Sequence, residues 1–330
     1  MTKPVANIKA VAEAAGVSKT TVSHVLSGRR PVAEGTRSVV LKVMADLGFQ
    51  PNYFARALTS KRSLTIALIV QDMTNPFYPA LGRGLQLAVS PANYVVMYFD
   101  AGASETLAQA FVAAALERRV DGVVAAVSGI DTEILTLQKA GIPVVAVGAG
   151  RSDLPVDWVS ADDERIARDA VVYLRGQGHN RIATICGPST RDPGERRLKG
   201  FVDEQRRAGV TDILSAEGDW TRESGAKGMA TLLDSPTPPT AVFCANDLMA
   251  IGAMDLALSR GVRVPQDIAM VGVDNIDASN LVRPALTTMH IPAVEIGRTA
   301  GDLLMSRIAG TAGAMRHVMV QHDFIGRQSA

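Results

Sequence analysis

The amino-acid sequence predicts a small all-α helix-turn-helix head followed by a bilobal α/β body with two doubly wound parallel-sheet lobes. Three observations lead to this fold class. Residues 7–28 carry apolar side chains at helical spacing on both sides of a glycine. From residue 64 onward, short apolar runs alternate with amphipathic stretches, as expected for strands buried between helices. The alternation breaks near residues 156–160 and then restarts, which predicts two lobes with a cleft between them.

Residues 7–28 read as two short helices joined by a tight turn. Asn7 is a good N-cap for the first helix, and Gly16 ends that helix where a turn needs a residue free of Cβ strain. Ser18 caps the second helix, whose exposed side chains are short and polar toward its N-terminal end. Such a helix suits the major groove of DNA, because base edges there are read by hydrogen bonds. The pattern alone also fits any small surface helical hairpin.

A third helix is predicted at residues 34–47, with Gly48 as its C-cap. Its apolar residues are expected to face inward, namely Val39, Val40, Val43, Met44 and Leu47. Pro51 can then open a very short helix at residues 52–58. About two turns are too few for a stable isolated helix. This segment is therefore predicted to be a linker that folds only when it packs against something.

The body follows this linker. The chain has 330 residues, too many for one ordinary core, and we expect residues 1–50 to form the head, 51–62 the hinge and 63–330 the body. Strands are predicted at residues 64–70, 94–99, 122–127, 143–147, 181–186, 241–245 and 268–273. Helices are predicted at residues 79–89, 106–117, 133–140, 166–176, 195–208, 224–233, 248–260 and 294–308. The first lobe is expected to hold residues 63–160 and 292–310, and the second lobe residues 161–290 and 311–330.

Charge is distributed unevenly along the chain. The formal net charge is only +1, but residues 1–62 carry ten Lys and Arg against three Asp and Glu, a net charge of +7. The remaining residues carry 24 basic and 30 acidic side chains, a net charge of −6. A basic head on a mildly acidic body is the electrostatic footprint of a nucleic-acid-binding head.

Several classes of protein and site are not supported. No apolar run is long enough to span a membrane, and residues 1–10 lack the apolar core of a secretory signal. Cys186 and Cys244 lie in apolar runs, so we expect buried free thiols, a reducing compartment and a cytoplasmic location. No catalytic constellation, metal-ligand spacing or phosphate-binding loop is present. The sequence therefore predicts no enzyme, no metal site and no cofactor.

The motifs of the head carry a family resemblance. The order VAxxAGVSxxTVSxVL, TR, LGFxPN and ARxL resembles the lactose-repressor/galactose-repressor (LacI/GalR) family of bacterial transcription regulators. Four stretches of the body support it, namely GHNRIATICGP (178–188), PTAVFCANDLMAIGAM (239–254), VPQDIAMVGVDN (264–275) and PALTTMHIP (284–292). The resemblance implies a body like that of periplasmic sugar-binding proteins, which the rhythm of strands and helices alone would also allow.

The resemblance also implies the residues that contact DNA. Lys19, Thr20 and His24 are expected to read bases. Phosphate or positioning contacts are expected from Ser18, Thr21, Ser23 and Arg37. In the family the linker is a hinge helix that orders on operator binding, and the matching residues here are Asn52, Ala55, Arg56 and Leu58. Leu58 matches the leucine that enters the minor groove, where an apolar wedge unstacks a base step and kinks the duplex.

Polar residues just past the apolar runs are the candidates for ligand binding. After the first strand these are Gln71, Asp72 and Asn75, and the aromatic Phe77 is a further candidate there. By resemblance, Arg197, Asn246 and Asp274 match the family's hydroxyl-binding set and Trp220 matches an aromatic platform. Arg, amide and carboxylate groups can hydrogen-bond a ring of hydroxyls while Trp covers the apolar face of the ring. Arg197 and Asp274 can also pair with each other when the site is empty.

Some of these positions have other readings. Asp247 can be a helix N-cap as well as a ligand contact, and Asp162 can cap the helix that follows it. Residues 75–77 can be purely structural. The family often has Asp-Asn and paired small residues where this chain has Asp-Asp-Glu-Arg at 162–165. Ligand contacts near Asp162 are therefore not carried over from the family.

Together these features predict a homodimeric, ligand-responsive transcription regulator. We expect a repressor that binds a near-palindromic operator and is released by a sugar or polyol. Residues 311–330 lack leucine heptads, so a dimer is expected rather than a tetramer held by a coiled coil. One alternative is a regulator whose ligand, a purine or a phosphoprotein, strengthens DNA binding. Less favoured are a sugar-binding protein without a DNA role and an enzyme on a doubly wound fold.

Overall fold

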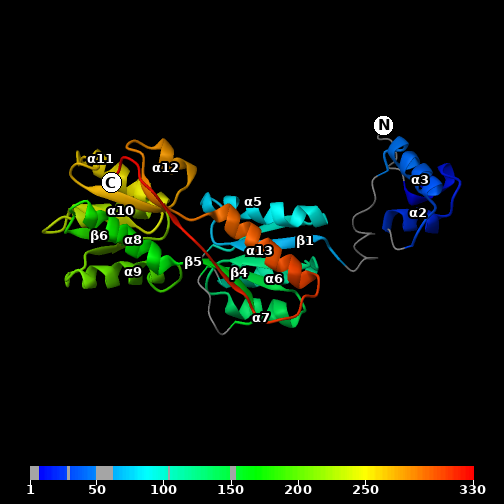
Figure 1. Ribbon diagram of the computed structural model, residues 1–330, viewed down its shortest axis with the longest axis horizontal. Coiled ribbons are helices and arrows are strands. Elements are labelled where there is room, and N and C mark those ends of the chain that lie inside the picture. Colours follow the sequence, from blue (N-terminus) through cyan, green and yellow to red (C-terminus); the bar gives the residue numbers. More distant parts are fainter. Residues whose placement is uncertain (1–6, 28–29, 50–61, 103–104, 149–153) are drawn as a thin grey trace. The chain divides into compact units, whose positions relative to one another are not determined.

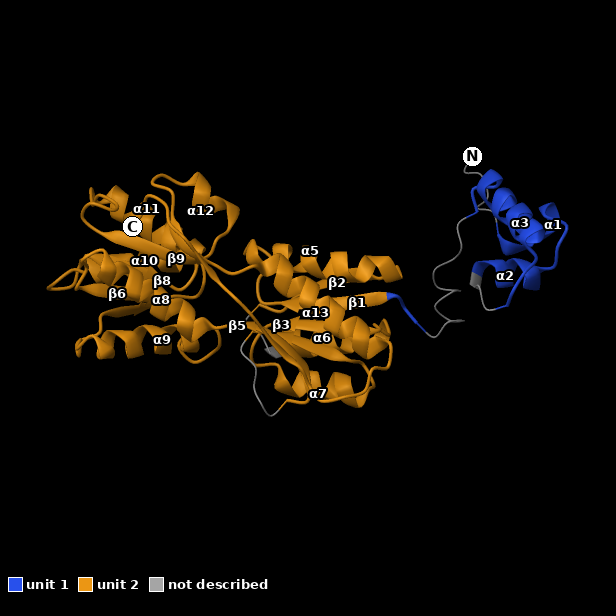
Figure 2. Cartoon of the chain, viewed as in Figure 1, with its two compact units in different colours: residues 1–64 blue, residues 65–330 orange. Residues whose placement is uncertain are grey.

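The computed structural model describes residues 7–27, 30–49, 62–102, 105–148 and 154–330 (Figure 1). These residues belong to two compact units, Met1–Leu64 and Thr65–Ala330 (Figure 2). The predicted hinge helix at residues 52–58 lies outside the described residues. Among the helices that the structure describes, none combines the length and the apolar character needed to cross a bilayer.

The first unit contains the predicted helix pair and third helix, α1 (Ile8–Ala14), α2 (Lys19–Ser27) and α3 (Glu34–Asp46). The side chain of Asn7 accepts hydrogen bonds from the backbone N–H groups of residues 9 and 10, which confirms it as the first N-cap. Gly16 adopts a φ of +64° in the turn, as its position predicts.

The core of this unit is narrower than the sequence suggests. Six side chains form it, namely Val11, Ala12, Val22, Val25, Val40 and Met44. Val43 packs against this cluster from a half-buried position, but Val39 and Leu47 are 48% and 42% exposed, so the prediction that they face inward is wrong. The reason is geometric, because α1 and α2 cover only the stripe of α3 that runs through residues 40, 43 and 44.

The first lobe of the body is a six-stranded sheet in the order β11-β5-β4-β3-β1-β2, and every neighbouring pair is parallel. Its strands are β1 (Thr65–Val70), β2 (Val95–Asp100), β3 (Gly122–Ala126), β4 (Val144–Val147), β5 (Asp157–Ala161) and β11 (His317–Val320). Its helices are α5 (Phe77–Val89), η1 (Ser90–Ala92), α6 (Glu105–Glu117), α7 (Asp131–Lys139) and α13 (Ala293–Ile308). Ile69 packs with Phe111 of α6 and Ile134 of α7, whereas Leu304 of α13 covers Gly122.

The second lobe is a six-stranded sheet in the order β12-β10-β9-β8-β6-β7, parallel except for the β10–β12 pair. Its strands are β6 (Ile182–Cys186), β7 (Ser215–Glu217), β8 (Ala241–Cys244), β9 (Ala269–Asp274), β10 (Thr287–His290) and β12 (Asp323–Ile325). Its helices are α8 (Asp163–Gly176), α9 (Gly194–Arg207), α10 (Arg222–Leu233), α11 (Asp247–Ser259) and α12 (Asp277–Leu281). Cys186 and Cys244 end two neighbouring strands as buried free thiols, as predicted.

The last twenty residues differ from the expected lobe assignment. We expected residues 311–330 in the second lobe, but β11 pairs with β5 in the first sheet, and only β12 pairs with β10 in the second. The chain therefore passes between the lobes three times, after β5, after β10 and between β11 and β12 (Figure 1).

Helices α5 and α13 lie in close contact on one face of the first sheet. A Cβ atom on Gly297 of α13 would lie 1.9 Å from the carbonyl oxygen of Leu81, and one on Gly84 of α5 would lie 2.0 Å from that of Val294. The two helix backbones can approach this closely only because neither position carries a side chain.

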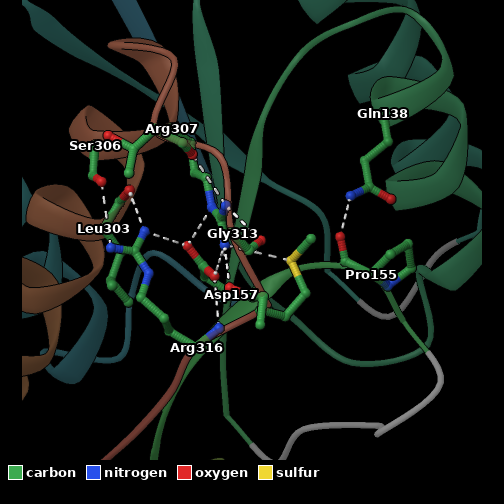
Figure 3. A network of polar contacts seen from close by, with 11 residues as sticks. Gln138, Pro155, Asp157, Leu303, Ser306, Arg307, Gly313 and Arg316 are labelled. Carbon is green, nitrogen blue, oxygen red and sulfur yellow. Dashed lines mark hydrogen bonds and ion pairs between the residues drawn. The ribbon is translucent and has the colours of Figure 1, made fainter.

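A buried carboxylate in the first lobe fixes the chain just before β11 (Figure 3). Asp157, at the start of β5, is fully buried and accepts from Nε and Nη2 of Arg307 at 2.9 and 2.7 Å. It also accepts from the backbone N–H of Arg316 at 2.8 Å and from Nη2 of Arg316 at 2.7 Å. Burial acts to raise the pKa of Asp157, but the hydrogen bonds from the two arginines outweigh it and hold the pKa well below its ordinary value.

Candidate functional site

The exposed face of α2 presents the predicted DNA-reading residues. Lys19 and Thr20 are exposed at its N-terminal end, and Ser23 and His24 are half-buried on the following turns. Arg37 is exposed on α3. The opposite face of α2 packs into the core through valines, so the polar row is available to an outside partner.

Two of the predicted DNA contacts also build the helix terminus. The hydroxyl of Ser18 accepts from the backbone N–H of Thr21 at 3.0 Å, which confirms it as the second N-cap. The two hydroxyls are also hydrogen-bonded to each other at 2.9 Å. The remaining candidates, Asn52, Ala55, Arg56 and Leu58, lie outside the described residues.

A cavity of about 850 Å³ lies between the two lobes of the body. It is lined by the segments that follow the carboxyl ends of several strands, which is where open parallel sheets bind ligands. The first lobe contributes the predicted residues Asp72, Asn75 and Phe77. The second lobe contributes Arg197, Trp220, Asn246 and Asp274. The structure therefore brings all seven residues into one cavity.

Arg197 lies on α9 and is only 5% exposed. Its Nε donates to Oδ1 of Asp163 at 2.8 Å, and its Nη1 donates to the backbone carbonyl of Ala245. The predicted pair with Asp274 is present over a longer distance, 4.0 Å from Nη1 to Oδ1. The guanidinium carbon lies 5.9 Å from the centre of the Trp220 ring, within the range of a cation–π contact. Arg197 is thus held from several sides before any ligand arrives.

Burial shifts the pKa values of acidic side chains in the cleft. It raises the pKa of Asp274 to about 7, although the nearby Arg197 acts to lower it. It also raises the pKa of Asp163, again opposed by Arg197. The pKa of the Tyr78 hydroxyl is raised, mainly by burial and to a smaller extent by the charge of Asp274. This group therefore remains a hydrogen-bond donor near neutral pH.

Asn246 and its neighbour have different structural roles from those expected. Asn246 is the N-cap of α11, because its Oδ1 accepts from the backbone N–H of Met249 at 2.9 Å. Its Nδ2 donates to the carbonyl of Trp220 at 3.0 Å, so it also fixes the loop that carries the tryptophan. Asp247 is neither the cap nor a cavity-lining residue. It is fully buried and accepts from the N–H of Ile276 at 2.9 Å and from the Thr288 hydroxyl at 2.6 Å.

Aromatic side chains line the cleft from both lobes. The backbone of Trp220 adopts a φ of +76°. Its indole ring packs against Gly187, where a Cβ atom would lie only 2.2 Å from the ring, so a larger residue at position 187 would collide with the indole. Phe77, Tyr78 and Trp158 line the same cavity from the first lobe. A flat ligand with hydroxyl groups matches this combination of aromatic surfaces and buried polar groups.

The sequence reasoning did not assign most of the other residues that line the cleft, among them Tyr78, Trp158 and Asp163. Asp162 is the N-cap of α8, as predicted, because its side chain accepts from the backbone N–H of Arg165 at 3.1 Å. The position of Asp163 directly after this N-cap is a signal in the sequence that could have identified it. Asp163 is thus the first residue of a helix at a lobe boundary, and loops and helix starts at the carboxyl ends of strands are where such sheets bind ligands. Trp158 lies on β5, which the sequence did not predict as a strand.

Comparison with known proteins identifies the family. Residues 7–52 match the bacterial regulatory proteins of the lacI family, and residues 171–330 match a periplasmic binding protein-like domain. The HTH-type transcriptional repressor CytR of Escherichia coli (strain K12) is 36% identical over 308 residues, which cover 92% of this chain and 90% of that protein. The chain belongs to the LacI family of bacterial regulatory proteins.

Solved structures from the LacI family agree with this fold. The lac repressor dimer bound to operator and the anti-inducer ONPF matches with a TM-score of 0.88 at 28% identity, covering 98% of this chain and 99% of that one. The complex of the transcriptional regulator CelR with cellobiose matches with a TM-score of 0.76 at 31% identity, covering 98% and 100%. The chain is thus a DNA-binding transcription regulator, with a helix-turn-helix head and a body of two α/β lobes.

Proposed function

We propose that this protein is a homodimeric transcriptional repressor that a sugar-like ligand releases from a near-palindromic operator in the cytoplasm. The observation that carries the proposal is the cleft, in which a buried arginine, two buried carboxyl groups and an indole ring surround one cavity between the lobes. The head would read the operator through Lys19, Thr20 and His24. Ser18, Thr21, Ser23 and Arg37 would contact phosphates or fix the position of the helix.

The domain boundaries proposed from the sequence complete this assignment. Residues 1–50 would form the DNA-binding head, residues 51–62 the hinge and residues 63–330 the ligand-binding and dimerisation body. In the hinge, Leu58 would enter the minor groove beside Asn52, Ala55 and Arg56. A dimer would bring two such hinges and two recognition helices to neighbouring half-sites.

Ligand binding would act by population shift. Arg197, Trp220 and Asp274 belong to the second lobe, and Asp72, Asn75 and Phe77 belong to the first. A ligand that contacts both sets binds the closed arrangement of the lobes more tightly than the open one. It can move the equilibrium only by that difference in affinity. Closure would change the contacts near residues 51–62 in the dimer, and the affinity for the operator would fall.

One solved relative supports the ligand class. It is the complex of the transcriptional regulator CelR with cellobiose. The body also offers the groups that hydroxyls need, namely a guanidinium, carboxyl groups and an aromatic face. The relatives found are regulators, and we propose no catalytic role for the chain.

The test begins with a thermal-shift screen of the purified protein against sugars, polyols, sugar phosphates and purines. Each hit is then added to a titration of the protein with DNA from its own upstream region at fixed salt. Release of DNA by a hit supports the proposed repressor. Tighter DNA binding in the presence of a hit would instead assign a corepressor, and the proposed sign of the response would be wrong.

A further inference from the structure

The cleft is strongly acidic. Eight carboxyl groups line it, namely Asp72, Asp100, Asp131, Asp163, Asp192, Glu195, Asp219 and Asp274. Two arginines, Arg191 and Arg197, are the cationic side chains among the described residues of the lining. Because the walls of the cleft have a low dielectric constant, this excess of negative charge acts over several ångströms on any charged ligand that enters.

The buried arginine offers no uncompensated charge to an anion. Its Nε is hydrogen-bonded to Asp163, and Asp274 lies 4.0 Å from its Nη1. Arg191 is exposed at the rim, where solvent and salt screen its charge. A phosphate group in the cleft would therefore have to compete with carboxylates for Arg197.

The helix termini near the cleft carry acids as well. Helix N-termini are common phosphate sites, because their free N–H groups and dipole favour negative charge. Here α7 begins with Asp131, α8 with Asp163, and α9 has Glu195 in its first turn, and all three residues line the cavity. Each of these three first turns therefore already carries a carboxylate, whose negative charge opposes the binding of a phosphate there.

We infer that the cleft selects an uncharged ligand that combines hydroxyl groups with a flat face, that it rejects phosphate esters, and that Asp163 is a residue that sets this specificity. The inference rests on the proposed function, because it names the class of ligand for the same cleft. The charge of Asp163 offsets that of Arg197, with which it forms a buried ion pair, and Asp163 also lines the cavity. Free sugars and nucleosides belong to this class, whereas their phosphate monoesters do not.

The two tryptophans of the chain provide a direct readout. Trp158 and Trp220 are the only tryptophans in the sequence, and both line the cavity, one in each lobe. Ligand binding in the cleft can therefore be followed by intrinsic tryptophan fluorescence, separately from anion binding to the basic head. The probes are ribose, glucose, cellobiose, cytidine and adenosine, each paired with its phosphate monoester at constant ionic strength.

At least one uncharged probe is expected to give a saturable fluorescence change, with its monoester bound at least about tenfold more weakly. A monoester that binds as tightly as its parent would overturn the inference. A panel in which no uncharged probe binds would overturn the assigned ligand class. A hit that binds but leaves operator affinity unchanged would refute the proposed induction while the ligand class stands, so the two failures are distinguishable.

The variant Asp163→Asn tests the residue itself. Its Oδ1 can still accept from Arg197, but the negative charge is gone, so the preference for the parent over the monoester should narrow by roughly tenfold. Asp203→Asn is the matched control, because it removes an exposed carboxylate of α9 that does not line the cavity. It should leave the preference unchanged. An equal preference in Asp163→Asn and wild type would exclude Asp163 as the specificity residue, and thermal unfolding verifies that both variants are folded.

Discussion

The guanidinium of Arg197 on α9 and the carboxylate of Asp163 on α8 form a buried ion pair, 2.8 Å from Nε to Oδ1, at the wall of the cleft. The pair joins the first turns of two helices that pack side by side in the second lobe. Removing one member of a buried ion pair leaves the other charge buried without a partner. The resulting loss of stability is larger than the net stability that the intact pair contributes. Changes at these two positions should therefore affect both stability and ligand response.

Replacement of Arg197 by alanine should abolish the ligand response while the operator remains bound. The cleft would lose its buried donor, and the body should lose about 3 kcal/mol of unfolding free energy because Asp163 is left unpaired. Operator titrations with and without ligand measure the first effect, and denaturant unfolding measures the second. Arg196→Ala is the control, since Arg196 is a half-exposed neighbour on the same helix. A ligand response equal to that of wild type would contradict the assignment of the cleft.

Leu58→Ala should weaken specific operator binding by about 1 kcal/mol or more, because the variant loses the wedge that kinks the duplex. Folding and ligand binding should not change. Leu135→Ala, on α7 in the body, is a matched control with the same side-chain truncation at a partly exposed site. The measurement is an operator titration at fixed salt. Equal operator affinity of Leu58→Ala and wild type would refute the hinge assignment.

The titration of Asp274 should make the stability of the ligand-free body depend on pH. Its pKa of about 7 in the folded protein lies above the ordinary value of 3.8, so the folded state retains a proton that the unfolded state releases. The contribution of this group to stability is therefore full below pH 3.8 and is lost as the pH rises toward about 7. Relative to wild type, Asp274→Asn should gain stability across this window. Parallel stability curves for the two proteins from pH 4 to pH 7 would contradict the prediction.

Asp157→Ala should destabilise the first lobe by about 3 kcal/mol, because Arg307 and Arg316 would lose their shared buried carboxylate. Thermal and denaturant unfolding measure the loss. The control is Asp255→Ala, which breaks an ion pair with Arg222 between partly exposed side chains and should cost less than about 1 kcal/mol. Equal losses in the two variants would show that the network around Asp157 adds nothing beyond a surface pair.

Gly297→Ala should destabilise the body by about 2 kcal/mol or more, because the added Cβ would collide with the backbone of α5 at Leu81. Gly176→Ala is the control at the end of α8, where an added Cβ meets nothing within 4 Å. The control should be neutral or slightly stabilising. A similar melting temperature for Gly297→Ala and wild type would mean that α5 and α13 can separate without cost.

Sequence reasoning predicted most of the central strands and seven residues of the cleft because both have local signals. Buried parallel strands are continuous apolar runs, and polar residues follow them where the sheet ends. The edge strands β7, β11 and β12 and the inner strand β10 are short, and segments such as Thr287–His290 are too polar to be distinguished from loops. Asp163 pairs with Arg197, which lies on a helix more than thirty residues later in the chain. Local spacing in the sequence does not identify such a distant partner.

The three passages of the chain between the lobes restrict how the body can move. With one connection, the lobes could twist and bend independently. With three, at residues 162, 291–292 and 321–322, their relative motion is restricted to rotation about an axis through the connections. Opening and closing are therefore one collective transition rather than separate loop motions, and we expect a single relaxation phase in the microsecond-to-millisecond range. A substitution that stiffens any one passage should slow ligand entry and ligand release together.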